Sequence, residues 1–181
     1  MKSKNLVLFF LPFIVLISCK KDVETKENVE TPEIQNKHFV VTLDLIVKKN
    51  DNIHLYYTQD RSINFNEEQS LWAEVKGNNE VQQVVFKLPE DVIPTDFRLD
   101  LGYGKNVEQT EIIFKKFMIN YYDRNFVASG AEIFNYFYNN KDNATVDKLT
   151  GTLKRLKVDQ ETAPSLYPQT SLEEELIKLT R

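Results

Sequence analysis

Apolar and polar residues alternate through most of the chain beyond residue 38, which is the period of a β-strand that buries one face. Turn-forming triplets, Asn50-Asp51-Asn52 and Gly77-Asn78-Asn79, interrupt this alternation. The runs on either side of the Asn50-Asp51-Asn52 turn predict a β-hairpin. The clearest alternating runs are 39–47, 53–58, 71–75, 84–88 and 97–101.

The longest β-like run, residues 111–122, changes its apolar phase in the middle. Phe114 belongs to one phase and Phe117 to the opposite one. A shift of one residue moves every following side chain to the other face of a sheet. One extra residue at Lys115-Lys116 would bring both halves back to the same face, so we predict a β-bulge there.

Two segments carry helix-start signals. Ser129 with Glu132 fits a capping box that opens a short helix, and Ser171 with Glu174 fits a second one. Apolar residues recur at helical spacing after Ser171, so the chain is expected to end in an amphipathic helix.

The remaining segments favour strands and loops. Asn139 to Asn143 reads as a loop, and a further strand is expected over about 152–158. Short alternating strands separated by turns indicate a mainly β fold. We expect one domain, residues 38–181, folded as an antiparallel β-sandwich, jelly-roll-like, with one short helix and a C-terminal helix.

The first residues have the pattern of a secretory signal. A basic start at Met1 to Asn5 precedes an apolar run from Leu6 to Ile17, and Ser18 ends it. The run is shorter than the roughly 20 apolar residues that a membrane-spanning helix needs. We therefore expect residues 1–18 to be a cleaved signal peptide.

The segment Leu16-Ile17-Ser18-Cys19 resembles the cleavage motif of bacterial lipoproteins. The resemblance implies that the Cys19 sulfur receives a lipid and that the chain is cut before Cys19. Acyl chains on Cys19 would anchor the protein to a membrane of the cell envelope, such as the outer membrane. Cys19 is the only cysteine of the chain, so no disulfide within one chain is expected. The alternative is a plain signal peptide with a chance cysteine.

Residues 19–37 are polar and charged, without aromatic residues, and predict a flexible tether. Lys21-Asp22 and the acids after it resemble the export signal of surface lipoproteins in Bacteroidota, although Val23 interrupts the acidic pair; a solvated linker is the alternative reading. The formal net charge is −4 and becomes about −6 when Lys2 and Lys4 leave with the signal. An acidic domain without basic clusters argues against nucleic acid as a partner.

Three short segments are similar to uncharacterised β-sandwich modules of Bacteroidota cell-envelope proteins. The resemblance implies a jelly-roll-like fold and a role in the envelope, and it supplies no catalytic residues. The segments are Leu55-Tyr56-Tyr57-Thr58, Val85-Phe86-Lys87-Leu88-Pro89 and Arg98-Leu99-Asp100-Leu101-Gly102.

Catalytic chemistry has little support in the sequence. A Ser or Cys nucleophile usually needs a base, and the only two histidines, His38 and His54, lie in no recognisable motif. The same scarcity argues against a metal site, and no cofactor is expected. A small glycan hydrolase needs only two carboxylates, so it stays open as an alternative. The acids available to it are Asp44, Asp51, Asp60, Glu67, Glu68, Glu74 and Asp100.

Aromatic residues give the better signal. Tyr56 and Trp72 lie on the phase opposite to the apolar set of their strands, and Tyr103 lies in a glycine-flanked loop. Exposed aromatic rings of this kind stack on sugars or contact proteins, unless another part of the fold covers them. The expected function is a non-catalytic binding module for a glycan or an envelope protein; a purely structural assembly subunit is a further alternative. The candidate ligand-binding residues are Tyr56, Gln59, Asp60, Arg61, Trp72, Tyr103 and Asn106.

Overall fold

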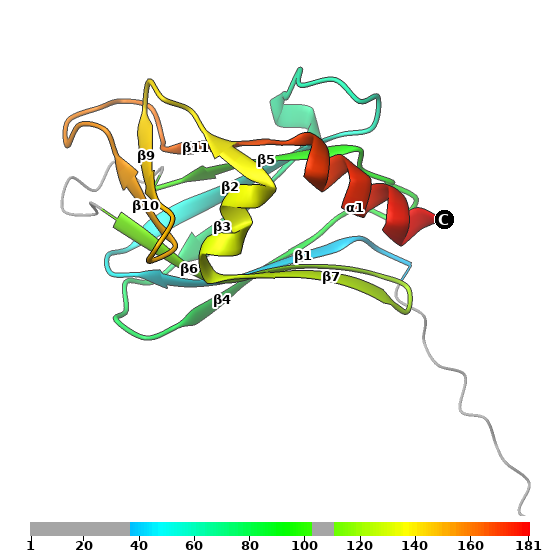
Figure 1. Ribbon diagram of the computed structural model, residues 1–181, viewed down its shortest axis with the longest axis horizontal. Helices are drawn as coiled ribbons and strands as arrows, with labels where there is room; N and C mark the ends of the chain where they lie inside the picture. The colour runs from blue at the N-terminus through cyan, green and yellow to red at the C-terminus, as the bar shows by residue number, and fades with distance from the viewer. Residues whose placement is uncertain (1–36, 103–110) are drawn as a thin grey trace, which may run out of the picture. The chain divides into compact units, whose positions relative to one another are not determined.

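The computed structural model describes residues 37–102 and 111–181. These residues form two antiparallel β-sheets that lie face to face (Figure 1). The predicted signal peptide, Cys19 and nearly all of the tether lie outside the described residues, as do Tyr103 and Asn106. The expected antiparallel β-sandwich is confirmed for the part that is described.

One sheet, the six-stranded sheet, has the order β4-β1-β6-β10-β9, and β7 also pairs with β6. The other, the five-stranded sheet, has the order β3-β2-β5-β11-β8. The six-stranded sheet consists of β1 (Val40–Val47), β4 (Gln82–Lys87), β6 (Glu111–Tyr121), β7 (Arg124–Ser129), β9 (Ala144–Asp147) and β10 (Thr152–Arg155). The five-stranded sheet consists of β2 (Asp51–Thr58), β3 (Ser70–Val75), β5 (Asp96–Leu101), β8 (Phe137–Asn139) and β11 (Ser165–Pro168).

The core lies between the two sheets and follows the alternation of the sequence. Leu43 on β1, Leu55 on β2 and Phe97 on β5 are all fully buried. Their strand neighbours with the opposite phase point outward, so each sheet has one apolar and one outer face. The outer faces are therefore the place to look for binding residues.

The predicted hairpin of β1 and β2 is wrong. β1 pairs with β4 and β6, whereas β2 pairs with β3 and β5 in the opposite sheet. Both strands carry a fully apolar face, and the two faces bury more surface when they pack across the core than when the strands pair side by side. The chain passes between the sheets again from β3 to β4 and from β4 to β5, while β2–β3 and β6–β7 are hairpins within one sheet.

The bulge predicted at Lys115-Lys116 is confirmed. Asp44 of β1 pairs with Lys116, but the next residue, Leu45, pairs with Phe114, so Lys115 is the extra residue. Phe114 is 1% exposed and Phe117 is fully buried, which shows that both halves of β6 face the core. Lys115, whose side chain is exposed, is the extra residue that lets the apolar residues on both sides of it face the core.

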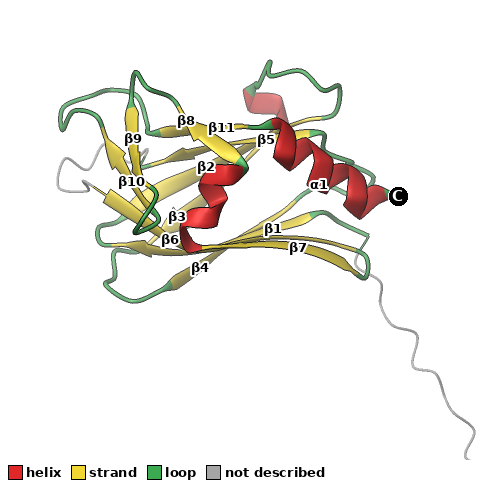
Figure 2. Cartoon of the chain, in the orientation of Figure 1, coloured by secondary structure: helices red, strands yellow, loops and turns green. Residues whose placement is uncertain are grey.

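The short helix is a 3₁₀ segment, η2 (Gly130–Asn135), and its capping box is present. The backbone N–H of Ser129 donates to the Glu132 carboxylate over 2.8 Å. The helix ends at Asn135, and Phe137 already belongs to β8. η2 carries the chain from the six-stranded to the five-stranded sheet (Figure 2).

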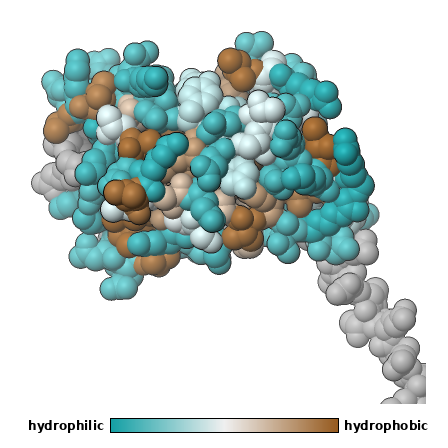
Figure 3. All heavy atoms as spheres, in the orientation of Figure 1, coloured by the Kyte–Doolittle hydropathy of each residue, from teal (hydrophilic) through white to brown (hydrophobic). Residues whose placement is uncertain are grey.

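The C-terminal helix α1 (Thr170–Thr180) is confirmed, but its predicted capping box is wrong. The N-cap is Gln169, and the Ser171 hydroxyl instead donates to the carbonyl of Asn135 over 2.5 Å. α1 contacts strands of both sheets and buries Leu172, Leu176 and Leu179. No helix of the described chain is long and apolar enough to cross a membrane. On the side drawn in Figure 3, hydrophilic side chains surround the apolar ones, as on most folded domains.

Candidate functional site

Aromatic and charged side chains gather on the outer face of the five-stranded sheet. Its strands turn their apolar residues, such as Leu55 and Leu99, into the core, which directs the alternate residues outward. We call this surface the outer aromatic face. It consists of His54, Tyr56, Trp72, Arg98, Asp100, Tyr138 and Tyr167.

Strand register sets these residues beside one another. His54 of β2 pairs with Trp72 of β3 on one side and with Asp100 of β5 on the other. Two residues further along β2, Tyr56 pairs with Arg98. At the other edge of the sheet Tyr167 pairs with Tyr138, so aromatic residues lie on both edge strands. Residues paired directly across antiparallel strands share a face and contact one another.

Trp72 is the most accessible residue of this group on its edge of the sheet, with 46% of its surface exposed. Its indole stacks on the His54 ring at 3.6 Å between centroids and an interplanar angle of 19°. The prediction that Trp72 points away from the core is therefore correct. The stacking contact holds the indole plane in place on one side.

The alternation of β2 directs His54 away from the core, together with Tyr56, but its side chain is fully buried. Tyr56 covers the ring with 3.8 Å between centroids, and Trp72 covers it as well. His54 does point away from the core, as the alternation of β2 predicts, but the Tyr56 and Trp72 rings exclude water from it. Within the described ranges, neither ring nitrogen of His54 has a hydrogen-bond partner; Nε2 lies 3.6 Å from Oε2 of Glu67.

The pKa of His54 is lowered to about 4, chiefly by burial; the Glu67 carboxylate opposes this shift and the nearby Arg98 adds to it. The imidazole is therefore neutral near pH 7. Without a hydrogen-bonded partner to orient it, His54 has little of what a general base requires. Its contacts indicate that His54 fills the space between Tyr56 and Trp72 in a stack of aromatic rings.

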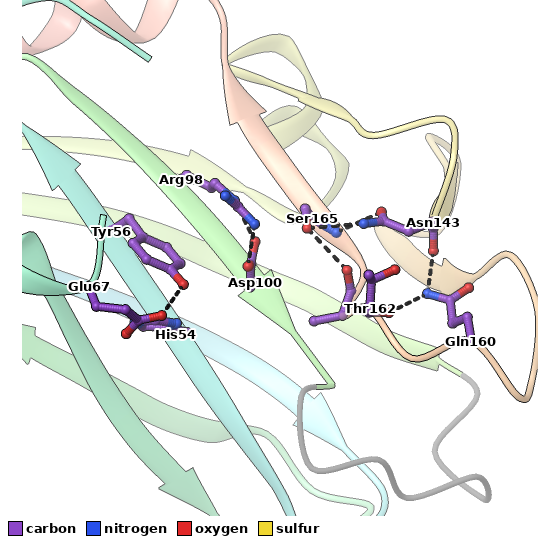
Figure 4. Close-up of polar contacts among 10 residues, drawn as sticks. His54, Tyr56, Glu67, Arg98, Asp100, Asn143, Gln160, Thr162 and Ser165 are labelled. Atoms are coloured by element: carbon purple, nitrogen blue, oxygen red, sulfur yellow. Dashed lines mark hydrogen bonds and ion pairs between the residues drawn. The ribbon is translucent and has the colours of Figure 1, made fainter. Parts of the chain in front are cut away.

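Tyr56 was expected to be an exposed platform, and this is wrong: only 8% of the residue is exposed. Its hydroxyl donates to Oε1 of Glu67 over 2.8 Å (Figure 4). Phe65 lies over the ring with 6.4 Å between centroids. Both covering residues come from the polar segment before β3, which includes the 3₁₀ turn η1 (Glu67–Gln69). Burial and the hydrogen bond to Glu67 raise the pKa of Tyr56 above its usual range.

An ion pair lies at the centre of the outer aromatic face. Arg98 binds Asp100 through two contacts, Nε to Oδ1 at 2.8 Å and Nη2 to Oδ2 at 2.6 Å (Figure 4). The guanidinium also lies 4.9 Å from the ring centroids of both Tyr56 and Tyr167. Burial raises the pKa of Asp100, and the contact with Arg98 opposes this rise. The planar guanidinium is thus fixed on three sides.

A surface pocket lies at the edge of the sheet opposite Trp72. It is lined by Tyr138, Asn139, Asn140, Lys141 and Tyr167. The two tyrosine rings are stacked, with centroids 5.8 Å apart and planes at 22°, and Tyr138 is 49% exposed. The sequence prediction missed this pocket, because neither β8 nor β11 was expected. β8 has only three residues, too few for alternation to be recognised, so the sequence offered no periodic signal for this pocket.

The candidate residues Gln59, Asp60 and Arg61 are exposed, but they do not lie beside Trp72. Gln59 follows the end of β2, five residues from His54, which is about 16 Å along an extended strand. Arg61 lies near α1, with Nε 3.5 Å from Oε1 of Glu173. The expected cluster of these polar residues with Trp72 is therefore not present.

The acids considered for a hydrolase are spread over the molecule. Asp44 pairs with Lys116 at 3.4 Å on the outer face of the six-stranded sheet. Glu67 and Asp100 both lie at the outer aromatic face, where Tyr56 donates to one oxygen of Glu67 and Arg98 contacts both oxygens of Asp100. Asp51 is buried at the start of β2, and Asp60, Glu68 and Glu74 are exposed. Within residues 37–102 and 111–181, no group of three or more His, Cys, Asp or Glu is arranged to hold a metal ion.

The described residues thus define an antiparallel β-sandwich with an aromatic outer face on its five-stranded sheet. Comparison of the chain with protein-family models, with curated proteins and with solved structures found no match.

Proposed function

We propose that this chain is a lipid-anchored protein of the bacterial cell envelope and that its outer aromatic face binds a glycan. The anchoring half of the proposal rests on the basic start, the apolar run and Leu16-Ile17-Ser18-Cys19. The binding half rests on the arrangement of the five-stranded sheet.

The observation that carries the proposal is the exposure of Trp72 on a rigid support. A half-exposed indole has no folding benefit from its outer surface, whereas a pyranose ring stacked on that surface would gain contact area. Because His54 already holds the indole plane, little side-chain entropy would be lost on binding. A flat apolar ring beside polar groups is the combination that a sugar, apolar on its faces and polar on its rim, requires.

The polar groups around Trp72 favour a glycan over a flat protein partner. Glu67 and the Arg98–Asp100 pair lie among the aromatic rings, so the apolar surface is broken into separate platforms. Protein interfaces tend to place their aromatic anchors in a contiguous desolvated core. Because Arg98 contacts both oxygens of Asp100 and Tyr56 donates to one oxygen of Glu67, we propose binding and not hydrolysis.

A retention assay tests this function. The full-length protein in mild detergent is applied to immobilised peptidoglycan and to neutral and acidic polysaccharides. We expect retention on at least one of them and, for Trp72→Ala, a loss of affinity of about fivefold or more. The variant should still unfold cooperatively, at a lower midpoint because the buried side of the indole covers His54.

The matched control is Val85→Ala. Val85 is 51% exposed but lies on β4, on the outer face of the six-stranded sheet. Its truncation should leave retention unchanged. Absence of retention on every glycan, or equal losses for the two variants, would contradict the proposal.

A further inference from the structure

The five-stranded sheet carries exposed aromatic residues at both of its edges. We infer that Trp72 and the pocket at Tyr138 and Tyr167 are two contact points for one extended glycan chain that lies across the sheet. This inference rests on the proposed function and narrows it: the ligand is an oligosaccharide or polysaccharide of several units, and a monosaccharide or disaccharide would reach only one contact point.

The positions of the two contact points follow from the sheet order. Trp72 lies on β3 and Tyr138 on β8, which are the two edge strands in the order β3-β2-β5-β11-β8. Four strand spacings of about 4.8 Å separate them, which is about 19 Å. Both side chains belong to the outer phase, because their neighbours Ala73 and Phe137 turn toward the core. A ligand that contacts both must therefore span the width of the sheet.

The pocket has the chemistry of a sugar-binding subsite. The stacked pair of Tyr138 and Tyr167 presents a ring that is half exposed, 49% for Tyr138. Asn139, Asn140 and the Lys141 ammonium border this ring and offer polar groups to hydroxyls. The Asn139 amide is itself fixed, since its nitrogen donates to the carbonyl of Ala144 over 2.7 Å. The pocket is thus an aromatic platform with a polar rim, as at Trp72.

The surface between the two contact points combines an aromatic ring with a fixed cation. The Phe65 ring lies 6.4 Å from that of Tyr56 and 6.2 Å from that of Tyr167, the two rings that flank Arg98. Arg98 lies on β5, the middle strand, and 23% of its side chain is exposed. Asp100 and the rings of Tyr56 and Tyr167 hold its guanidinium in place. A guanidinium has more donors than the Asp100 carboxylate uses, so it is suited to hydrogen-bond hydroxyls of a chain that passes over it.

Two contact points on one ligand make affinity depend on ligand length. Once one unit is stacked on Trp72, contact with Tyr138 becomes an intramolecular step with a high effective concentration. A short oligosaccharide reaches one platform, and a long one reaches both. Affinity is therefore expected to rise steeply at the length that first spans the sheet.

Calorimetric titration of the full-length protein tests the inference. The probes are size-fractionated oligosaccharides, from disaccharide to octasaccharide, cut from the polysaccharide that the retention assay identifies. We expect wild type to bind the octasaccharide at least about tenfold more tightly than the disaccharide. Tyr138→Ala should abolish this gain, whereas Tyr138→Phe, which keeps the ring, should retain it.

The outcomes separate the inference from the proposed function. If Trp72→Ala weakens binding but Tyr138→Ala leaves the length dependence intact, the inference is wrong and the proposed function stands. Equal affinity of wild type for disaccharide and octasaccharide would also overturn the inference. If wild type retains no polysaccharide at all, the proposed function fails and the inference fails with it. An unchanged unfolding midpoint of Tyr138→Ala excludes loss of folding as the cause.

Discussion

Burial gives His54 and Asp96 opposite effects on stability as the pH falls. The pKa of His54 is lowered from 6.5 to about 4, and that of Asp96, on the neighbouring strand, is raised from 3.8 to about 6. Both shifts arise chiefly from the loss of water around the charged form. Below pH 6.5 the unfolded chain protonates His54 before the folded chain does, so stability is lost. Below pH 6 the folded chain protonates Asp96 first, so stability is gained.

Single variants should separate these two contributions. Each shift corresponds to roughly 3 kcal/mol between about pH 7 and about pH 4. As the pH falls over this range, the unfolding free energy of His54→Phe is expected to rise relative to wild type, because the variant lacks the loss of stability that His54 causes. Over the same fall in pH, the unfolding free energy of Asp96→Asn should decrease relative to wild type, because the variant lacks the gain that Asp96 provides. Chemical denaturation at several pH values measures both differences, and pH-independent differences would contradict the assigned pKa shifts.

At the level of single residues, the sequence predicts whether a side chain points toward or away from the core, but not whether other residues cover it. The phase of β2 and β3 correctly directs Tyr56 and Trp72 away from the core. It does not reveal that Phe65 and Glu67 cover Tyr56, because the segment from Gln59 to Ser70 is polar and has no regular period. Which outward ring remains exposed depends on a loop that periodicity does not describe.

Among the elements, β6 shows most directly how one residue sets the register. Deleting Lys115 removes the bulge and forces one half of the strand to turn its apolar residues outward. Truncation of a single buried Phe typically costs about 3–5 kcal/mol, so the loss from expelling Phe114 and its neighbours should exceed that figure. We expect the deletion variant to lack a cooperative unfolding transition in circular dichroism.

The control for this deletion is Lys115→Ala, which keeps the extra residue. Because Lys115 is exposed, its truncation should change the unfolding free energy by no more than about 0.5 kcal/mol. A deletion variant that unfolds like wild type would show that β6 tolerates either register.

The sequence predicts the long strands well and the short ones poorly. Strands such as β1 and β6 have enough residues for alternation to be recognised. β8, β9 and β11 have 3, 4 and 4 residues, too few to show a period, and were missed as separate strands. The predicted strand near 152–158 ends at Arg155. The missed strands β8 and β11 carry the Tyr138 pocket, so half of the candidate site was not predictable from periodicity.

At the scale of the whole molecule, the account joins a membrane anchor to a binding domain. Cys19→Ser should release the protein from the membrane fraction or leave its precursor uncleaved, since the serine has no thiol to accept a lipid. Detergent partitioning and electrophoretic migration measure these two outcomes. Identical partitioning and migration of the variant and wild type would contradict the lipoprotein proposal.

The central claim is that a glycan stacks on the outer aromatic face, and the fluorescence of Trp72 tests it most directly. Trp72 is the only tryptophan of the chain, so its emission reports on this one position. Titration of wild type with the retained polysaccharide should shift the emission to shorter wavelength and saturate at the affinity found by calorimetry, because the sugar displaces water from the indole. Saturable binding by calorimetry with unchanged Trp72 emission would contradict the claim, since the glycan would then bind elsewhere on the molecule.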